Sequence, residues 1–243
     1  MRRPEELIEI GLRRRRVVVA NEAHHGLRRS VRTRLIGRRL VVHGDALGIK
    51  HLAMEALHPP AFAEEANRRR QAPEVSGGYL AQPEMRELIE SALARDWTLH
   101  AYEADLAAKP AGLTPGSDDE TNWREHVQAA NLAALVATLP DDAALLVWCG
   151  NHHLARRGAG SWRPMAARLI DDYGIDPFVI DQTLTVDFGD GRARVAAQWV
   201  AQVADELERF GGTAGFLAEE APDGWPYTDL ADAFLLALDN ALD

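Results

Sequence analysis

Histidine and glutamate side chains gather at the ends of three apolar runs in this sequence. The runs are RVVVAN, HLAMEAL and AALLVWC, and the polar residues that end or follow them are Glu22, His24, His25, Glu55, Asn151, His152 and His153. A neutral histidine beside a carboxylate acts as a general base, because the carboxylate fixes its tautomer and stabilises the imidazolium that forms. A second histidine and an arginine can bind an anionic intermediate or a leaving oxygen.

Other kinds of chemistry fit these residues as well. The same histidines and glutamates could ligate a transition metal. Taken singly, a glutamate can cap a helix or pair with an arginine, and two adjacent histidines can form a polar turn. The sequence has no glycine-rich phosphate loop, no serine nucleophile elbow and no paired CxxC. Cys149 ends an apolar run, which is typical of a buried structural cysteine.

The apolar runs alternate with segments of helical spacing. Strands are expected at 16–21, 51–57, 97–103, 143–149 and 178–180, and helices at 25–42, 61–67, 82–94, 118–139 and 165–173. This alternation predicts an α/β fold, a mainly parallel sheet with helices on both faces. In such sheets the ligand site lies beyond the carboxyl ends of the strands, so we expect the polar residues that follow the runs to converge.

The pattern changes after about residue 183. A strand pair is expected at 183–188 and 192–199, and a short amphipathic helix at 230–242. We therefore divide the chain into an α/β core domain, 1–183, and a small strand and helix extension, 184–243, packed on the same domain. The length of 243 residues suits one large domain of this kind.

Charge and composition narrow the possible partners and compartment. Lysine and arginine number 27 against 37 acidic residues, a net charge of −10, which disfavours nucleic acid as a partner. Cys149 is the single cysteine and favours a reducing compartment. No apolar stretch is long enough to span a membrane, and the basic N-terminus lacks the apolar core of a signal peptide. We therefore expect a cytoplasmic protein that contacts no membrane.

Five segments between about 16 and 182 resemble the erythromycin esterase-like family. They are NEAHHG, LAMEA, NWREHVQAANLAAL, VWCGNHHLAR and SWRPMAARLIDDYG, in the family's order and with similar spacing. Asn21 replaces the family's usual glycine, Gly150 replaces a histidine, and the large helical insertion of the macrolide esterases is absent. The superfamily also includes haem-binding ChaN-like proteins and TraB/Tiki metalloproteases, which carry paired GxxH motifs. Gly150–His153 fits GxxH, and Asn21–His24 fits it with asparagine in place of glycine.

The resemblance implies a role for each candidate residue. The catalytic base is His25 in the esterase alignment and His24 in the GxxH alignment, and we favour His25 because Gly26 follows it. Glu55 orients the base or shares its proton, and Glu22 supports the histidine loop. His153 and Arg124 hold the substrate or the developing oxyanion, so Arg124 should be mostly buried and within reach of Glu22 or Glu55. The substrate contacts implied in addition are His24, Tyr79 and Asn151.

Three functions follow from this resemblance. The first is a hydrolase without metal or cofactor, in which activated water attacks the ester or lactone carbonyl of a small molecule and no covalent enzyme intermediate forms. The alternative is a non-catalytic ChaN-like protein that binds haem or a metal. A Tiki-like metalloprotease is the third.

Overall fold

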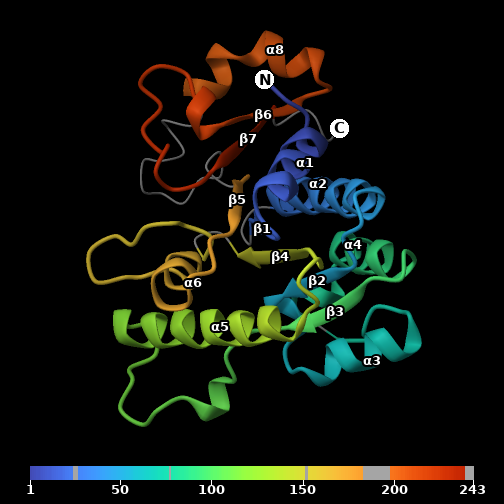
Figure 1. The fold of residues 1–243 in the computed structure, drawn as a ribbon, viewed down its shortest axis with the longest axis vertical. Coiled ribbons are helices and arrows are strands. Elements are labelled where there is room, and N and C mark those ends of the chain that lie inside the picture. Colours follow the sequence, from blue (N-terminus) through green and yellow to red (C-terminus); the bar gives the residue numbers. More distant parts are fainter. Residues whose placement is uncertain (24–26, 77, 151–152, 183–197, 239–243) are drawn as a thin grey trace.

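The computed structural model of the protein describes residues 1–243 except 24–26, 77, 151–152, 183–197 and 239–243, and gives the backbone alone for 27–30. Seven strands of these residues form one sheet in the order β3-β2-β4-β1-β5-β7-β6 (Figure 1). They are β1 (Val17–Glu22), β2 (His51–Met54), β3 (Thr98–Ala101), β4 (Leu145–Gly150), β5 (Phe178–Asp181), β6 (Thr213–Leu217) and β7 (Ala233–Ala237). Neighbouring strands are parallel except for the β6–β7 pair. The predicted α/β class is confirmed.

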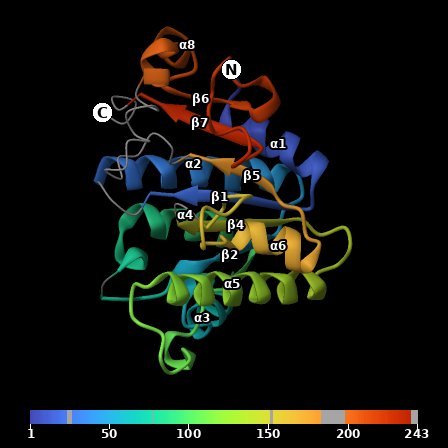
Figure 2. The same cartoon turned by 90° about the vertical axis from the view of Figure 1, so that its left-hand side faces the viewer.

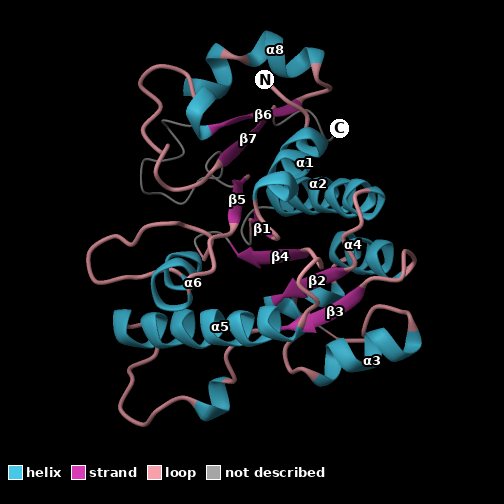
Figure 3. Ribbon diagram, in the orientation of Figure 1, coloured by secondary structure: helices cyan, strands magenta, loops and turns pink. Residues whose placement is uncertain are grey.

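Helices cover both faces of the sheet (Figure 3). One face carries α1 (Pro4–Arg14), α2 (Leu27–Ala46), α3 (Ala61–Arg69) and α4 (Pro83–Leu93). The other carries α5 (Asp118–Thr138), α6 (Met165–Tyr173) and α8 (Ala204–Arg209), with α5 and α6 side by side (Figure 2). Short 3-10 helices occur at η1 (Glu55–Leu57), η2 (Tyr79–Ala81), η3 (Leu106–Ala108) and η4 (Ala218–Glu220).

The two hydrophobic cores explain why the strands appear as continuous apolar runs. Val18 and Ala20 of β1 pack into the core beneath α1, α2 and α4, whereas Val17 and Val19 pack into the core beneath α5 and α6. Successive side chains of a strand point to opposite faces, so a strand covered on both sides needs apolar residues at nearly every position. This two-sided burial holds the carboxyl ends of the central strands in fixed register.

Two sequence predictions need correction, and a third lies almost wholly outside the described residues. The helix expected at 230–242 is wrong, because Ala233–Ala237 forms β7, which is inserted between β5 and β6 and buried along its whole length. A short, fully buried apolar run has no periodicity that separates a strand from a helix. The strand pair expected at 183–188 and 192–199 lies outside the described residues, apart from 198 and 199, which are helical. The strand expected at 51–57 ends at Met54, where η1 begins.

The last part of the chain extends the sheet of the first part. β7 pairs in parallel with β5, and β6 lies beyond β7 at the sheet edge. α1, which the sequence patterns did not predict, packs against both β5 and β6. No helix among the described residues is both long and apolar enough to cross a lipid bilayer.

Candidate functional site

The carboxyl ends of five parallel strands meet at one edge of the sheet, and a charged or titratable residue lies at each. Glu22 ends β1 and Asp181 ends β5. Glu55 follows β2 directly, as the first residue of η1, and Glu103 follows β3. His153 lies just after β4. The predicted convergence of Glu55 and His153 at this edge is therefore found in the structure.

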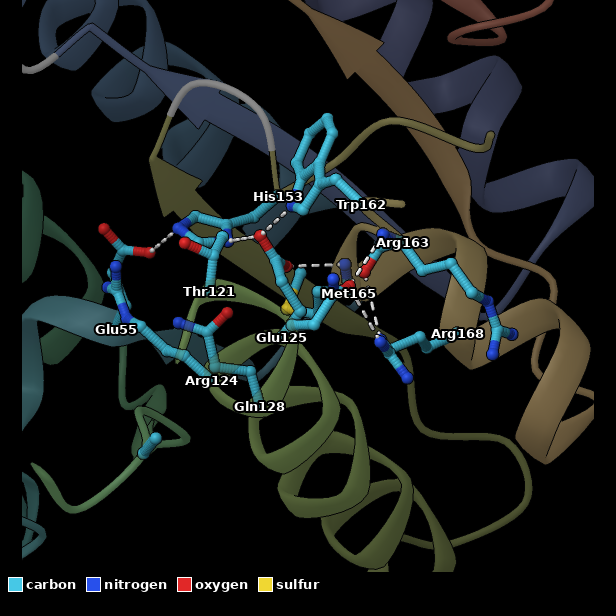
Figure 4. A network of polar contacts seen from close by, with 12 residues as sticks. Glu55, Thr121, Arg124, Glu125, Gln128, His153, Trp162, Arg163, Met165 and Arg168 are labelled. Atoms are coloured by element: carbon cyan, nitrogen blue, oxygen red, sulfur yellow. Dashed lines mark hydrogen bonds and ion pairs between the residues drawn. The ribbon is translucent and has the colours of Figure 1, made fainter. Parts of the chain in front are cut away.

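His153 lies between two carboxylates that come from different parts of the chain (Figure 4). Its Nδ1 is 2.9 Å from Oε1 of Glu125 on α5, and its Nε2 is 3.5 Å from Oε2 of Glu55. The side chains are 13% exposed for His153, 8% for Glu55 and 2% for Glu125, so the three groups interact where water screens their charges only weakly.

Glu125 is fixed by two further donors. The indole Nε1 of Trp162 donates to its Oε1 at 3.1 Å, and the backbone N–H of Met165, at the start of α6, donates to its Oε2 at 2.7 Å. A carboxylate held on both oxygens cannot turn away from the histidine. Glu125 therefore sets the orientation of the His153 ring and leaves Nε2 directed toward Glu55 (Figure 4).

The two carboxylates change the protonation of His153. Burial on its own lowers the pKa of the imidazole, because it disfavours the charged form. The charge of Glu55 and the hydrogen bond and charge of Glu125 act in the opposite direction and outweigh it, so the pKa of His153 is raised above its ordinary value. The ring therefore keeps its proton to a higher pH than an isolated histidine does, and its Nε2 faces Glu55 at the sheet edge.

Glu22 is bound in a separate, fully buried cluster. Arg34 of α2 donates to both of its carboxylate oxygens, at 2.8 and 3.3 Å, and Trp148 Nε1 donates to Oε2 at 3.1 Å. The guanidinium of Arg34 also bonds to Gln82 and lies 5.9 Å from the ring centroid of Tyr79. Glu22 is therefore a buried acid with an arginine partner, Arg34.

Arg124 lies at the site, but its hydrogen-bonded partner is Glu103 and not the predicted Glu22 or Glu55. It forms a two-pronged pair with Glu103, which follows β3, and Glu55 acts on the guanidinium through its charge. Gln128, one turn further along α5, donates to the same carboxylate at 3.0 Å. The reason is the position of α5, which crosses the loop after β3 and binds that loop along one face. The Arg124 side chain is 36% exposed and so can be reached by a ligand.

The remaining candidates divide into described and undescribed residues. His25, the favoured base, lies outside the described residues, as do His24 and Asn151. Tyr79, at the start of η2, is 38% exposed at the rim of the site. Burial raises the pKa of its hydroxyl, and the charges of Glu55 and Glu22 raise it further, which places Tyr79 within their electrostatic reach. Its role in binding substrate stays a prediction.

Sequence reasoning missed Glu125 and Glu103 as site residues. Apolar spacing alone would turn Val127, Ala130, Leu132, Leu135 and Val136 inward, but the buried residues of α5 are Glu125, Gln128, Ala129 and Leu132. These four occupy positions i, i+3, i+4 and i+7 of one helical face. That spacing was a usable signal, because it puts a glutamate and a glutamine on the apolar stripe of a helix.

Cysteine and metal chemistry have little support among the described residues. Cys149 is fully buried in β4, and burial raises the pKa of its thiol well above the ordinary value, so it is a structural cysteine as predicted. Within the described part of the chain, no three histidine, cysteine, aspartate or glutamate side chains are arranged to hold a metal ion.

Among known proteins, solved structures with a similar fold match this chain, as follows. No known family and no curated protein matches the sequence. RRSP, an effector domain of a MARTX toxin from Vibrio vulnificus, matches with a TM-score of 0.54 and 18% identity over 75% of this chain and 36% of that chain. A structure described as bacterial protein toxins matches with a TM-score of 0.52 and 13% identity over 74% and 37% of the two chains.

A further solved structure concerns cofacial haem binding to ChaN of Campylobacter jejuni. It matches with a TM-score of 0.53 and 8% identity over 96% of this chain and 91% of that chain. The chain shares its fold with ChaN. It spans about a third of the length of the toxin chains but nearly all of ChaN. These identities show a common fold, and function has to be argued from the site.

Proposed function

We propose that this protein is a hydrolase in which activated water attacks the carbonyl of a small ester or lactone. The observation that carries the proposal is the contact of His153 with both Glu55 and Glu125 at the carboxyl edge of the sheet. The motifs that resemble the erythromycin esterase-like family supply the reaction type. The fold match to ChaN supports the superfamily to which the erythromycin esterase-like family belongs, but it gives no information on ester hydrolysis.

In this proposal His153 acts as the acid. Glu125 fixes its ring and, together with Glu55, raises its pKa, which favours the imidazolium. A protonated Nε2 stabilises the oxyanion that forms when water attacks and can then pass its proton to the leaving oxygen. Arg124, held by Glu103 and partly exposed, supplies a second positive charge for the substrate.

The base that takes the proton of water is His25, or His24 in the alternative alignment. This assignment rests on the resemblance, as does the role of Glu55 in orienting the base. Glu22 acts at a distance, because its tie to Arg34 and Trp148 holds the end of β1, from which the histidine loop leaves. The substrate is a small molecule, and the compartment expected from the single cysteine is the cytoplasm.

Haem binding is the alternative that the likeness to ChaN raises. His58 and Tyr79 are residue types that can ligate haem iron, and both line one cavity beside the site. However, no arginine or lysine is among the described residues of that lining, whereas Glu74 is, and a haem brings two negatively charged propionates. The described lining of this cavity therefore does not fit a haem, and we derive no step through one.

A panel of small esters and lactones tests the proposed function. Turnover should rise with pH through about 6.5, the ordinary histidine value, as the base loses its proton, and it should survive a chelator. His25→Ala should lower the rate by about 10²–10⁴ and leave the fold intact. Turnover unchanged in both His25→Ala and His24→Ala would remove this mechanism, and activity lost to chelator and restored by metal would replace it with a metalloenzyme.

A further inference from the structure

A cavity opens beside Glu55 and takes no part in the chemistry described so far. It has a volume of about 490 Å³, which lies within the range of small-molecule sites. The side chains that give it its character are Ala56, His58, Phe62, Val75, Tyr79 and Leu80. They come from η1, α3, η2 and the segment that leads into η2.

The cavity is lined by the same two 3-10 helices, η1 and η2, that carry Glu55 and the candidate substrate contact Tyr79. Ala56 and His58 come directly after Glu55, on η1 and at its end, and η1 packs against η2, which begins with Tyr79. Tyr79 lines the cavity and is within electrostatic reach of Glu55. A substrate whose carbonyl lies at Glu55 and His153 can therefore extend one of its substituents past Tyr79 into this cavity.

The lining indicates the chemistry of that substituent. Aliphatic and aromatic side chains share the wall with polar groups such as Ser76, and the described lining holds neither arginine nor lysine that would pair with an anionic group. Glu74, whose side chain is 80% exposed, adds negative charge at the lining. The imidazole of His58 adds an uncharged or cationic polar group to the lining.

We propose that this cavity binds an uncharged hydrocarbon substituent of the substrate, which then lies against the ring of His58. The inference rests on the proposed hydrolase function and narrows the substrate to an ester or lactone with an apolar arm. The arm is either the acyl chain or the alcohol side, since both flank the scissile carbonyl. The cavity then determines specificity, while His153 and its carboxylates carry out the reaction.

The first experiment measures kcat/KM for two ester series. One lengthens the acyl chain from acetate through butyrate and hexanoate to octanoate with a fixed alcohol, and the other lengthens the alcohol of an acetate ester. In the series whose arm enters the cavity, kcat/KM rises about fourfold per buried methylene until the cavity is full. Val75→Trp fills the cavity and removes this dependence. Val42→Trp, at a 43% exposed valine on α2, retains both the activity and the dependence.

The second experiment measures binding without turnover. Primary amides of the same chain lengths are titrated while the ring resonances of His58, assigned with His58→Gln, are followed by NMR. Affinity that rises with chain length and shifts the His58 signals supports the cavity even if no ester is hydrolysed, in which case the hydrolase proposal alone fails. Ester turnover indifferent to chain length in both series, with unshifted His58 signals, overturns the cavity proposal. A Soret band on haemin addition that His58→Gln abolishes also overturns it.

Discussion

Two buried glutamates at the same sheet edge each accept an indole N–H and pair with a different cationic side chain. Glu22 accepts an indole N–H from Trp148 and pairs with Arg34. Glu125 accepts an indole N–H from Trp162 and pairs with His153. Both indole bonds are 3.1 Å long, and both carboxylates are almost wholly buried. The essential difference is the cation, an arginine in one cluster and a histidine in the other.

That difference separates a structural charge pair from a reactive one. Arginine keeps its proton at any physiological pH, so the Glu22 pair can hold β1 and α2 together but cannot exchange protons. Histidine changes charge near neutral pH, and here a second carboxylate, Glu55, lies 3.5 Å from its other nitrogen. Variants of His153 and Arg34 each alter one cluster and spare the other, and a variant of Arg124 tests the neighbouring pair with Glu103.

The largest effect is expected for His153→Gln. Removing the group that donates the proton should lower ester turnover by about 10²–10⁴, the usual share of a positioned acid or base. Steady-state kinetics measures it, with circular dichroism to show that the fold persists. His126→Gln, at an exposed histidine next to Glu125 on α5, is the matched control and should retain wild-type turnover. Equal losses of turnover in the two variants would show that His153 has no specific role in the reaction.

Arg34→Ala should act on stability. It leaves the Glu22 carboxylate buried without its cation, which should lower the free energy of unfolding by about 3–5 kcal/mol. Urea denaturation measures the loss. Arg38→Ala, one turn further on α2, breaks an exposed pair with Glu87 and should cost less than about 1 kcal/mol. Adding Glu22→Gln to Arg34→Ala should recover part of the loss, and no recovery would contradict the account of a stranded charge.

Arg124→Ala should give an intermediate effect that falls on binding. The guanidinium is partly exposed and shared with Glu103, so its removal should raise KM about tenfold, the equivalent of about 1.4 kcal/mol, with little change in kcat. Arg124→Lys keeps a positive charge but loses the two-pronged bond to Glu103, and should recover only part of the affinity. A fall in kcat with an unchanged KM would show instead that Arg124 stabilises the transition state and not the bound substrate.

The smallest effect concerns stability and pH. Because folding raises the pKa of His153, the folded protein binds this proton more tightly than the unfolded chain does. The resulting stabilisation is complete below the pKa of His153 in the unfolded chain, about 6.5. It is lost as pH rises through the pKa of His153 in the folded protein. The free energy of unfolding of the wild type, measured with urea, should therefore fall as pH rises above neutral. This fall should be absent from His153→Gln. Identical pH profiles of the two proteins would contradict a raised pKa.

The sequence was most informative where strands are buried on both faces. Apolar runs located β1, β2 and β4, and the residues after them gave Glu22, Glu55 and His153. Parallel pairing then implies that these residues share an edge, because all such strands end on the same side. β7 was mistaken for a helix for a related reason, since Ala233–Ala237 is too short for its apolar pattern to show a period.

The rotation of α5 about its axis was harder to predict. An alanine-rich helix has small apolar residues on most sides, so apolar spacing alone leaves the inward direction undecided. The deciding residues are polar, because Glu125 and Gln128 point inward to bind His153 and Glu103. Polar side chains of a helix usually face the solvent, but here contacts with other parts of the fold turn two of them inward at the functional site.

An NMR titration of His153 tests the central claim most directly, because it reports the proton on the ring that Glu55 and Glu125 flank. The Cε1–Hε1 resonance, assigned with His153→Gln, is followed against pH in wild type, Glu55→Gln and Glu125→Gln. The account predicts a wild-type midpoint above about 6.5 that falls in each variant, because each carboxylate favours the imidazolium. A midpoint at or below about 6.5 that neither substitution moves would contradict it.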